Sequence, residues 1–246
     1  MRRFVFAALF VIVAAGSASA QPDRLLSPLA VAVACAPPPT YDKPEGRLLR
    51  ILGSQDAIPR SIFGERDLLV IGGGTSAGVQ LGQQFFVRRT ITYGSARGTR
   101  GARTLGWLRV VAVNDSTAIA VVDHVCNAIA TSDYLEPFVE PVVSADYERD
   151  EATGQPDFSH LGHIVAGNED RTAVGAGDLA LIDWGQAQGL EPGARFAIYR
   201  DVGIHGMPLA SIGEGVVIST SHKMALTRVT RARDAVYTGD YIALRK

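Results

Sequence analysis

Residues 67–89 read DLLVIGGGTSAGVQLGQQFFVRR, and residues 178–200 read DLALIDWGQAQGLEPGARFAIYR. These two stretches align without a gap at an offset of 111 residues, and 8 of the 23 positions are identical. A second match, between residues 105–138 and 212–245, follows at an offset of 107, with 8 of 34 positions identical. Glycines, aspartates and apolar positions recur in the same order, which indicates that one module is duplicated within the chain.

Both copies alternate apolar and polar residues over short runs, a pattern typical of half-buried β-strands. The first copy predicts strands at 47–52, 67–72, 85–89, 105–113 and 117–123, and from Tyr134 onward. The second copy predicts strands at 163–166, 178–183, 196–200, 212–219 and 224–230, and from Tyr241 onward. Helical turns are compatible with the sequence only at 125–130 and 232–236.

About six short strands per copy predict a small closed or nearly closed barrel, because closure removes the exposed edges of a sheet. The predicted fold class is therefore all-β, with two tandem β-barrel-like modules joined by an acidic linker. The expected divisions are a signal peptide, an extended arm, the first module, the linker and the second module, at residues 1–20, 21–42, 43–139, 140–161 and 162–246.

The first 20 residues have the pattern of a secretory signal peptide. Arg2 and Arg3 precede an apolar run from Phe4 to Ala15, and Ala18-Ser19-Ala20 matches the small-x-small pattern that signal peptidase cleaves. The apolar run is shorter than the roughly 20 residues of a membrane span, although an uncleaved anchor is the alternative. We expect cleavage after Ala20, a periplasmic location, and no integral membrane span in the mature chain.

The chain has two cysteines, Cys35 and Cys126. An even pair in an exported protein favours a disulfide, which here would attach the N-terminal arm to the first module. Two separate thiols are one alternative. Another is lipidation of Cys35, because Ala32-Val33-Ala34-Cys35 has some likeness to a lipoprotein cleavage box.

The duplicated pattern resembles a known family of bacterial envelope modules. Its residues are Asp67, the Gly74-x-x-x-Gly78-x-x-x-Gly82 run, Phe85, Arg89 and the closing Asp133-Tyr134, with their counterparts in the second copy. The pattern is similar to the C-terminal module of flagellar assembly protein T, and to paired modules that follow LysM domains in Gram-negative envelope proteins. The resemblance implies a small β module and carries over no catalytic residue. This sequence has no recognisable LysM domain.

Several enzyme motifs fail on their context. Gly74-x-Ser76-x-Gly78 matches a nucleophile elbow, but an alternating strand follows it where the elbow requires a helix, and the second copy has Ala187 in place of Ser76. A Ser76–His124–Asp123 triad remains open, although Asp123 and His124 are adjacent and point to opposite faces of a strand. Gly72-x-Gly74 lacks the crossover helix of a dinucleotide site, and no P-loop lysine follows it.

No metal or cofactor site is expected. His160 and His163 are three residues apart, and no further ligand stands at a zinc-site spacing. Asp146, Glu148, Asp150 and Asp157 faintly resemble a calcium loop. However, its glycine and final glutamate positions hold Glu151 and Asp157, so a solvated linker is the preferred interpretation.

The charge balance excludes a general nucleic-acid binder. Without residues 1–20 the chain has 22 basic and 25 acidic residues. Two arginine groups are candidate contacts for an anionic glycan, a lipid headgroup or an acidic partner, although pairing with the acidic linker or exposure to solvent is the preferred interpretation. They are Arg97, Arg100 and Arg103, and Arg228, Arg231 and Arg233.

These observations predict a non-enzymatic envelope protein that acts as a scaffold or adaptor through protein–protein contacts. The alternative is a peptidoglycan or glycan-binding module, with an envelope protein or cell-wall component as the partner in either case. Four aromatic residues lining one groove would favour the alternative: Trp107, Trp184, Tyr199 and Tyr241. A serine hydrolase that uses Ser76 is the third hypothesis.

Overall fold

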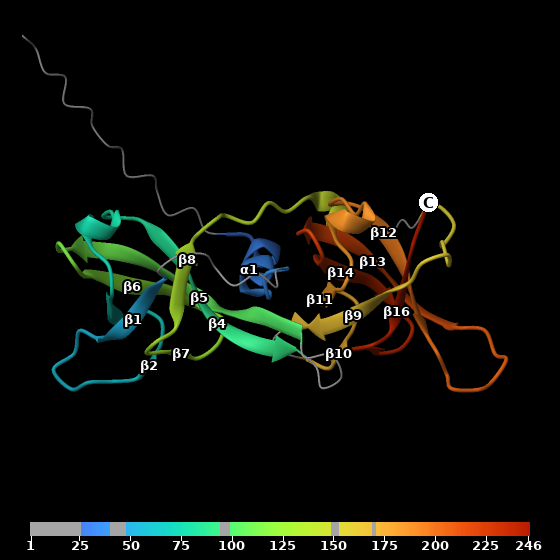
Figure 1. Cartoon of the computed structure of the whole chain (residues 1–246), viewed down its shortest axis with the longest axis horizontal. Helices are drawn as coiled ribbons and strands as arrows, with labels where there is room; N and C mark the ends of the chain where they lie inside the picture. The colour runs from blue at the N-terminus through green and yellow to red at the C-terminus, as the bar shows by residue number, and fades with distance from the viewer. Residues whose placement is uncertain (1–25, 40–47, 94–98, 149–152, 169–170) are drawn as a thin grey trace, which may run out of the picture.

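The computed structural model describes residues 26–39, 48–93, 99–148, 153–168 and 171–246; the predicted signal peptide at residues 1–20 lies outside this part. The chain forms two separate closed antiparallel barrels of six strands each, one from each sequence copy (Figure 1). The predicted all-β fold with two tandem barrel modules is therefore confirmed. In the described residues, no helix has the length and apolar character needed to cross a membrane.

The two barrels share one strand order. The first barrel closes in the order β1-β3-β6-β5-β4-β8, and the second in the equivalent order β9-β11-β14-β13-β12-β16. The strands of the first barrel are β1 (Leu49–Ser54), β3 (Leu68–Ile71), β4 (Gln84–Tyr93), β5 (Thr99–Val113), β6 (Ala118–Val125) and β8 (Tyr134–Pro137). Those of the second are β9 (Gly162–Gly167), β11 (Leu179–Ile182), β12 (Arg195–Arg200), β13 (Ala210–Thr220), β14 (Ala225–Ala232) and β16 (Tyr241–Leu244).

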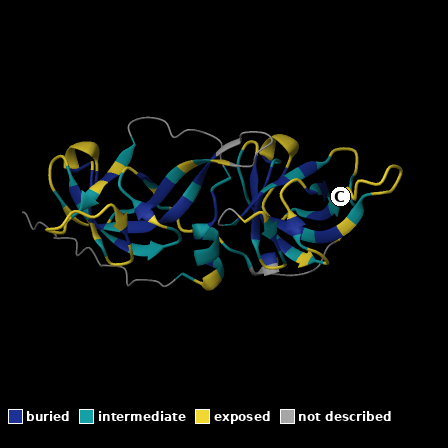
Figure 2. Ribbon diagram, turned by 90° about the horizontal axis from the view of Figure 1, so that it is seen from below, coloured by how far each residue is buried: buried dark blue, intermediate teal, exposed yellow. Residues whose placement is uncertain are grey.

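Each barrel is filled by the inward side chains of its strands. Ile71, Phe85 and Leu108 are buried in the first, and Ile182 and Phe196 are buried in the second. Figure 2 shows buried residues along the strands of both barrels and exposed residues on the loops at the two ends of the molecule. Apolar residues therefore alternate along the strands because every second side chain points into the interior of its own barrel.

The two segments expected as helical turns form short strands, so that prediction is wrong. β7 (Ile129–Ala130) pairs with β2 (Ile62–Phe63), and β15 (Val236–Tyr237) pairs with β10 (Ala173–Val174). Two-residue strands are too short to show a period in sequence. Only the paired segment, more than 60 residues away in each case, reveals them.

The sequence predicted an extended N-terminal arm, and this is wrong for Pro28–Cys35, which forms the helix α1. Ser27 caps its first turn by accepting a hydrogen bond from the backbone N–H of Ala30 (3.2 Å), and Pro28 lies at the first helical position, where its missing N–H costs nothing. The helix sequence PLAVAVAC is apolar on every side. Such a helix is stable only where it is surrounded by protein, which the neighbouring barrels provide.

α1 lies between the two barrels (Figure 1). Ala34 packs with Phe86 and Trp107 on the outer face of the first barrel. Ala32 and Val33 pack against the outer face of the second barrel, where Leu181 and its neighbours are buried. The helix therefore joins the outer surfaces of both barrels through apolar side chains on different sides of its eight residues, which make about two turns.

Two further segments close the junction. The β4–β5 hairpin is longer than its counterpart β12–β13 and brings Ile91 of the first barrel against the second. The linker forms the 3-10 turn η2 (Ala145–Glu148), whose Tyr147 is buried on the second barrel and donates from Oη to the Ile218 carbonyl (3.4 Å). The sequence predicted a solvated linker. The structure instead packs the linker against the second barrel at Tyr147.

Gly74 and Gly185 explain why one glycine recurs in both copies. Each precedes a 3-10 turn, η1 (Thr75–Ala77) or η4 (Gln186–Gln188), that hydrogen-bonds to a neighbouring hairpin loop. In the first copy the N–H of Thr75 donates to the Asn114 carbonyl (2.9 Å). A Cβ on Gly74 would overlap that carbonyl oxygen, so only glycine allows the two backbones to approach this closely.

We predict that Gly74→Ala lowers the free energy of unfolding by about 1–3 kcal/mol, because the backbone must shift to relieve the overlap. Gly53→Ala is the matched control, since a Cβ at that strand position would have no atom within 4 Å. Urea unfolding followed by circular dichroism measures both. Equal stability of the two variants would contradict the close approach at Gly74.

Candidate functional site

The repeated polar residues hold the barrels together. Arg89 donates from Nε and Nη2 to both carboxylate oxygens of the buried Asp133 (2.8 Å each), and Arg200 makes the equivalent contacts with Asp240 (2.9 and 2.7 Å). Asp133 also accepts from the Ala130 backbone N–H at 2.7 Å. Each pair is a bidentate clamp between two strands, which accounts for the recurrence of both residue types in the repeat.

A second repeated ion pair joins the segment before β3 or β11 to the start of that strand. Asp67 accepts from the Gly64 backbone N–H (2.8 Å) and from Arg60 (3.0 Å), and Asp178 accepts from Gly175 in the same way (2.8 Å). The Gly64 hydrogen bond, followed by Arg60, lowers the pKa of Asp67 below its usual value. The polar residues that recur in both copies thus stabilise the barrels. Residues specific to a function are therefore expected among the positions that differ between the copies.

The three residues of the possible hydrolase triad are not brought together. Ser76 donates from Oγ to the Asp115 carbonyl (2.7 Å), at one end of β6. Asp123 pairs with Arg109 (3.1 Å), and His124 lies near the opposite end of β6, about 20 Å along the strand from its first residue. The structure therefore gives Ser76 a turn contact and no general base from this triad.

The other polar residues singled out in the sequence are dispersed. His163 contacts Asp183 through Nδ1 (3.0 Å), whereas His160 contacts Ser159 (3.1 Å). Asp157 pairs with Lys246 (2.5 Å), and Asp150 and Glu151 of the possible calcium loop lie outside the described residues. Hydrogen bonds from Lys246 and then from Ser159 lower the pKa of Asp157.

The second arginine group is divided in the structure. Arg228 donates to the Tyr147 carbonyl (3.1 Å) and so helps to dock the linker. Arg231 and Arg233 are exposed, and no ion pair joins either of them to another described residue. Of the first group, Arg97 and the side chain of Arg100 lie outside the described residues.

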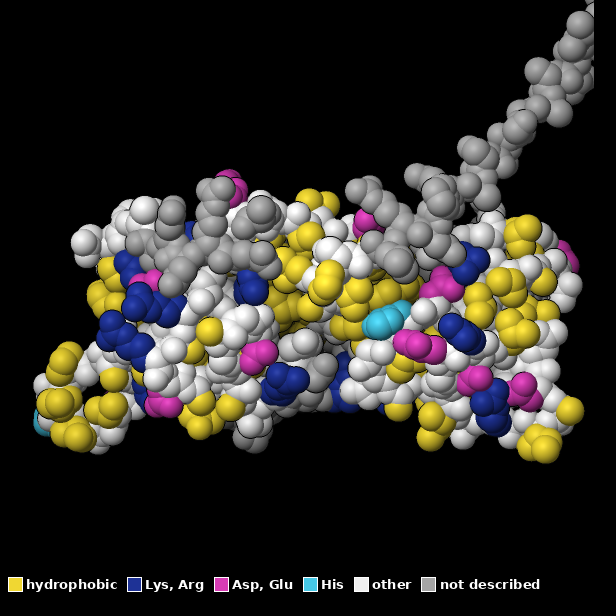
Figure 3. Space-filling view, turned by 180° about the vertical axis from the view of Figure 1, so that it is seen from behind, with side chains coloured by type: hydrophobic (Ala, Val, Ile, Leu, Met, Phe, Trp, Pro, Cys, Tyr) yellow, Lys and Arg dark blue, Asp and Glu magenta, His cyan; other side chains and the backbone are white. Residues whose placement is uncertain are grey.

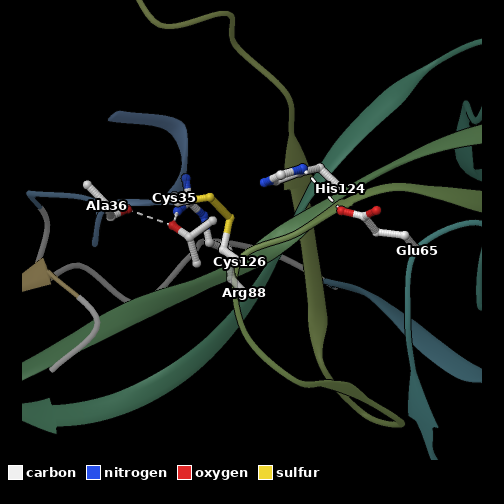
Figure 4. Close-up of a disulfide and its surroundings, with 7 residues drawn as sticks. Cys35, Ala36, Glu65, Arg88, His124 and Cys126 are labelled. Atoms are coloured by element: carbon white, nitrogen blue, oxygen red, sulfur yellow. Dashed lines mark hydrogen bonds and ion pairs between the residues drawn. A yellow bond between two sulfur atoms is a disulfide. The ribbon is translucent and has the colours of Figure 1, made fainter. Parts of the chain in front are cut away.

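The predicted disulfide between Cys35 and Cys126 is confirmed, with the two Cα atoms 5.4 Å apart. It attaches the last residue of α1 to the segment that follows β6. His124 stacks on Trp107 with ring centroids 4.5 Å apart, and its Nδ1 lies 3.4 Å from a Glu65 carboxylate oxygen. Figure 4 shows the imidazole between the Glu65 carboxylate and the disulfide.

Within the part of the chain that the structure describes, Cys35, His124 and Cys126 are the only group of three side chains with metal-ligand spacing. Their ligand atoms all lie within 4.8 Å of one another. From the sequence, His124 was a candidate only for a triad, and the cysteines were candidates for a disulfide, for two separate thiols or, at Cys35, for lipidation. The signal in the sequence that could have found the cluster is the His124-x-Cys126 spacing, because residues two apart in extended backbone point to the same side.

The four aromatic residues expected to line a glycan groove separate into different environments. Trp107 is buried under α1, and Trp184 packs against the core of the second barrel. Tyr199 and Tyr241 are cross-strand neighbours on the outside of that barrel. Phe158 extends the row beside Tyr199, with ring centroids 4.9 Å apart, and His163 extends it beside Tyr241, at 5.0 Å. We call these four side chains the aromatic row: Phe158, Tyr199, Tyr241 and His163.

One outer face is buried in the second barrel and more exposed at the equivalent positions of the first. In the second barrel, four apolar residues of this face are buried under α1, Ile91 and Tyr147: Leu179, Leu181, Ile218 and Leu226. Their counterparts in the first barrel form what we call the open face: Leu68, Val70, Val111 and Ile119. Leu68 is 41% exposed and Val111 39%, against 2% for Leu179 and 3% for Ile218. The open face is therefore an apolar sheet surface that nothing in the described chain covers to the same extent.

A second exposed apolar feature is the loop 201–209 between β12 and β13, which protrudes from the second barrel (Figure 1). Val202, Ile204 and Met207 are all exposed on it, and Figure 3 shows hydrophobic side chains gathered there, at the lower left. The Gly203 N–H donates to Asp201 (2.8 Å), and Met207 N–H donates to the Ile204 carbonyl (3.1 Å). These bonds give the loop a defined shape.

Comparisons with known proteins give no identity for the chain: no family model matches it, and no curated protein matches it either. The resemblance to the flagellar assembly and LysM-associated modules stays a prediction from the repeated motif.

Tyr134 begins β8 directly after the clamp residue Asp133, and its buried phenol provides a test of the packing there. Burial, together with the nearby Glu136 charge, raises the pKa of Tyr134 to about 12. Between pH 10 and 12, Tyr134 therefore ionises in the unfolded chain but stays neutral in the folded one, so the free energy of unfolding falls as the pH rises.

We predict that Tyr134→Phe removes this loss, changing the stability difference from wild type by about 2 kcal/mol between pH 9 and pH 11.5. Urea unfolding at each pH measures it. Tyr237→Phe, at an exposed position, is the control for general effects of alkali. A stability difference between Tyr134→Phe and wild type that stays constant with pH would contradict the burial of the phenol.

Proposed function

We propose that this chain is an exported, non-enzymatic protein of the bacterial cell envelope that acts as a scaffold or adaptor by binding a partner protein. The observation that carries the proposal is the open face of the first barrel. Its apolar residues match, position by position, a face that the second barrel buries against an apolar helix of this same chain. The export pattern of residues 1–20 and the disulfide support a location in an oxidising compartment.

The covered face of the second barrel indicates what kind of partner fits the open one. There, the small and β-branched side chains Ala32, Val33 and Ala36 lie over strands β11, β13 and β14. A partner segment with a short apolar surface would bury Leu68, Val70, Val111 and Ile119 in the same manner. Exposed apolar patches on folded proteins mark interaction sites, because their burial is favourable by roughly 25 cal/mol per Å².

A scaffold also requires that its contact surfaces keep a fixed separation. α1, Ile91 and Tyr147 all pack between the barrels, and the disulfide attaches α1 to the first one. This junction supports a single relative placement of the first barrel, which carries the open face, and the protruding loop 201–209 of the second barrel (Figure 1).

We predict that Leu68→Ser combined with Val111→Ser abolishes capture of the partner from native envelopes by crosslinking and pull-down. Both positions are exposed, so the fold is expected to persist. The matched control is Ile204→Ser combined with Met207→Ser on the protruding loop, which removes similar exposed apolar surface and is expected to retain capture. Unchanged capture by the Leu68 and Val111 variant would overturn the open face as the contact.

A second candidate function is binding of a cell-wall glycan, and the aromatic row favours it. Phe158, Tyr199 and Tyr241 present ring surfaces on the outside of the second barrel. Burial raises the pKa of Tyr199, and the charges of Arg245 and Glu214, which form an ion pair (2.6 Å), act on it in opposite directions. Sugars bind proteins through stacking on aromatic rings together with hydrogen bonds to charged side chains, and both are present here.

We predict that, if the row binds glycan, Phe158→Ala combined with Tyr199→Ala lowers sedimentation with purified sacculi by about tenfold. Tyr237→Ala, which removes an exposed aromatic side chain elsewhere on the same barrel, is the control. The absence of any sedimentation by the wild-type protein would exclude this second function and leave the adaptor proposal untouched.

A further inference from the structure

We propose that Cys35, His124 and Cys126 form a zinc(II) site when the disulfide is reduced. The inference is independent of the proposed scaffold function. It rests on three ligand atoms within 4.8 Å of one another, drawn from the end of α1 and from the end of β6.

The three residues are the ligand types that zinc prefers. Two thiolates and one imidazole match a borderline-soft d10 cation, and three protein ligands leave a fourth position for water or a carboxylate. Around a tetrahedral zinc ion, sulfur and nitrogen donors lie about 3.5–3.8 Å apart. The sulfurs must separate from their bonded positions and the imidazole must approach them, and both changes are within the range of side-chain torsions.

His124 is oriented as a metal-binding histidine would be. Its Nδ1 faces the Glu65 carboxylate at 3.4 Å, so Nε2 is left for the side of the sulfur atoms (Figure 4). A carboxylate behind the imidazole is the usual outer partner of zinc-bound histidines, because it fixes the ring and increases the basicity of the ligand nitrogen. Stacking on Trp107, with an interplanar angle of 26°, holds the ring plane.

The backbone on both sides of the disulfide is held by contacts other than the S–S bond. The Ala36 carbonyl accepts from Thr104 Oγ1 (2.7 Å), and the buried Arg88 donates to that same hydroxyl. Cys126 N–H donates to the Leu105 carbonyl (2.9 Å). Since α1 is also packed between the barrels, we infer that reduction leaves both cysteines beside His124.

The chemistry requires a dithiol reductant. A thiolate of the dithiol attacks the disulfide, and the dithiol leaves as its own cyclic disulfide, so two electrons and two protons reach Cys35 and Cys126. Zinc(II) then replaces the two thiol protons, which pass to solvent, and binds the neutral imidazole of His124. All three residues are partly exposed, so both reagents have access to them.

The test is metal titration of the purified full chain after reduction with a dithiol and anaerobic removal of the reductant. Cobalt(II) reports the geometry through thiolate-to-metal charge transfer and tetrahedral d–d absorption, and zinc(II) is then titrated against a chromophoric chelator. We expect one equivalent of tight binding by the reduced chain and none by the disulfide form.

Three variants identify the ligands. Cys35→Ser is expected to remove the charge-transfer band, His124→Gln to weaken zinc binding at least tenfold, and Glu65→Gln to weaken it about tenfold through loss of the outer partner. His222→Gln, an exposed histidine on the second barrel, is the control and is expected to bind as the wild type does.

Zinc binding of equal strength in His124→Gln and wild type would overturn the site, as would the absence of binding by the reduced chain. Circular dichroism of the reduced chain is recorded in parallel. Loss of the β-sheet signal on reduction would also overturn the proposal. The three ligands lie together only while the first barrel is folded and α1 packs against it. His124→Gln keeps both cysteines, so it tests the ligand set even if Cys35→Ser fails to fold.

Discussion

The architecture depends on the burial of one short helix that has no polar side. α1 consists of eight residues, PLAVAVAC, and its apolar side chains contact the outer surfaces of both barrels at once. An isolated helix of this length is unstable in water, so it exists only because it packs against the two barrels. In turn, α1 sets the position of one barrel relative to the other. Ile91 and Tyr147 pack in the same apolar cluster on the second barrel. Two independent modules thereby become one unit.

The residues that the two copies share and the residues in which they differ have different roles. The shared residues maintain the barrels, through the Arg89–Asp133 and Arg200–Asp240 clamps and through the close backbone approach at Gly74 and Gly185. The features that distinguish the copies are those with functional potential. One outer face is buried in the second barrel and open in the first, the aromatic row occurs only on the second, and Cys126 and His124 have Arg233 and Arg231 as their counterparts. A protein built in this way has one barrel face engaged internally and one available to a partner.

The disulfide cluster lies at the junction itself. Cys35 ends the helix that both barrels contact, and Trp107, on which His124 stacks, is part of the same apolar cluster as Ala34. The group that holds α1 to the first barrel is therefore also the group with metal-ligand chemistry. A change of state at these sulfur atoms acts on the element that sets the geometry of the whole molecule.

The sequence by itself determined the repeat, the barrel strands, the cysteine pair and the turn glycines, because these depend on short-range periodicity and on an internal comparison between copies. It did not reveal the two-residue strands, because their partners are distant in sequence. It also did not reveal α1, because the helix is apolar on every side and so shows no helical period, and because three prolines follow it. It also grouped Arg228 with Arg231 and Arg233, which the fold separates. Only the tertiary structure decided which apolar faces are covered and that His124 meets the two sulfur atoms. Those outcomes depend on contacts between distant segments, which no local pattern encodes: Cys35 and Cys126 are 91 residues apart, and α1 is still farther in sequence from the strands that it covers.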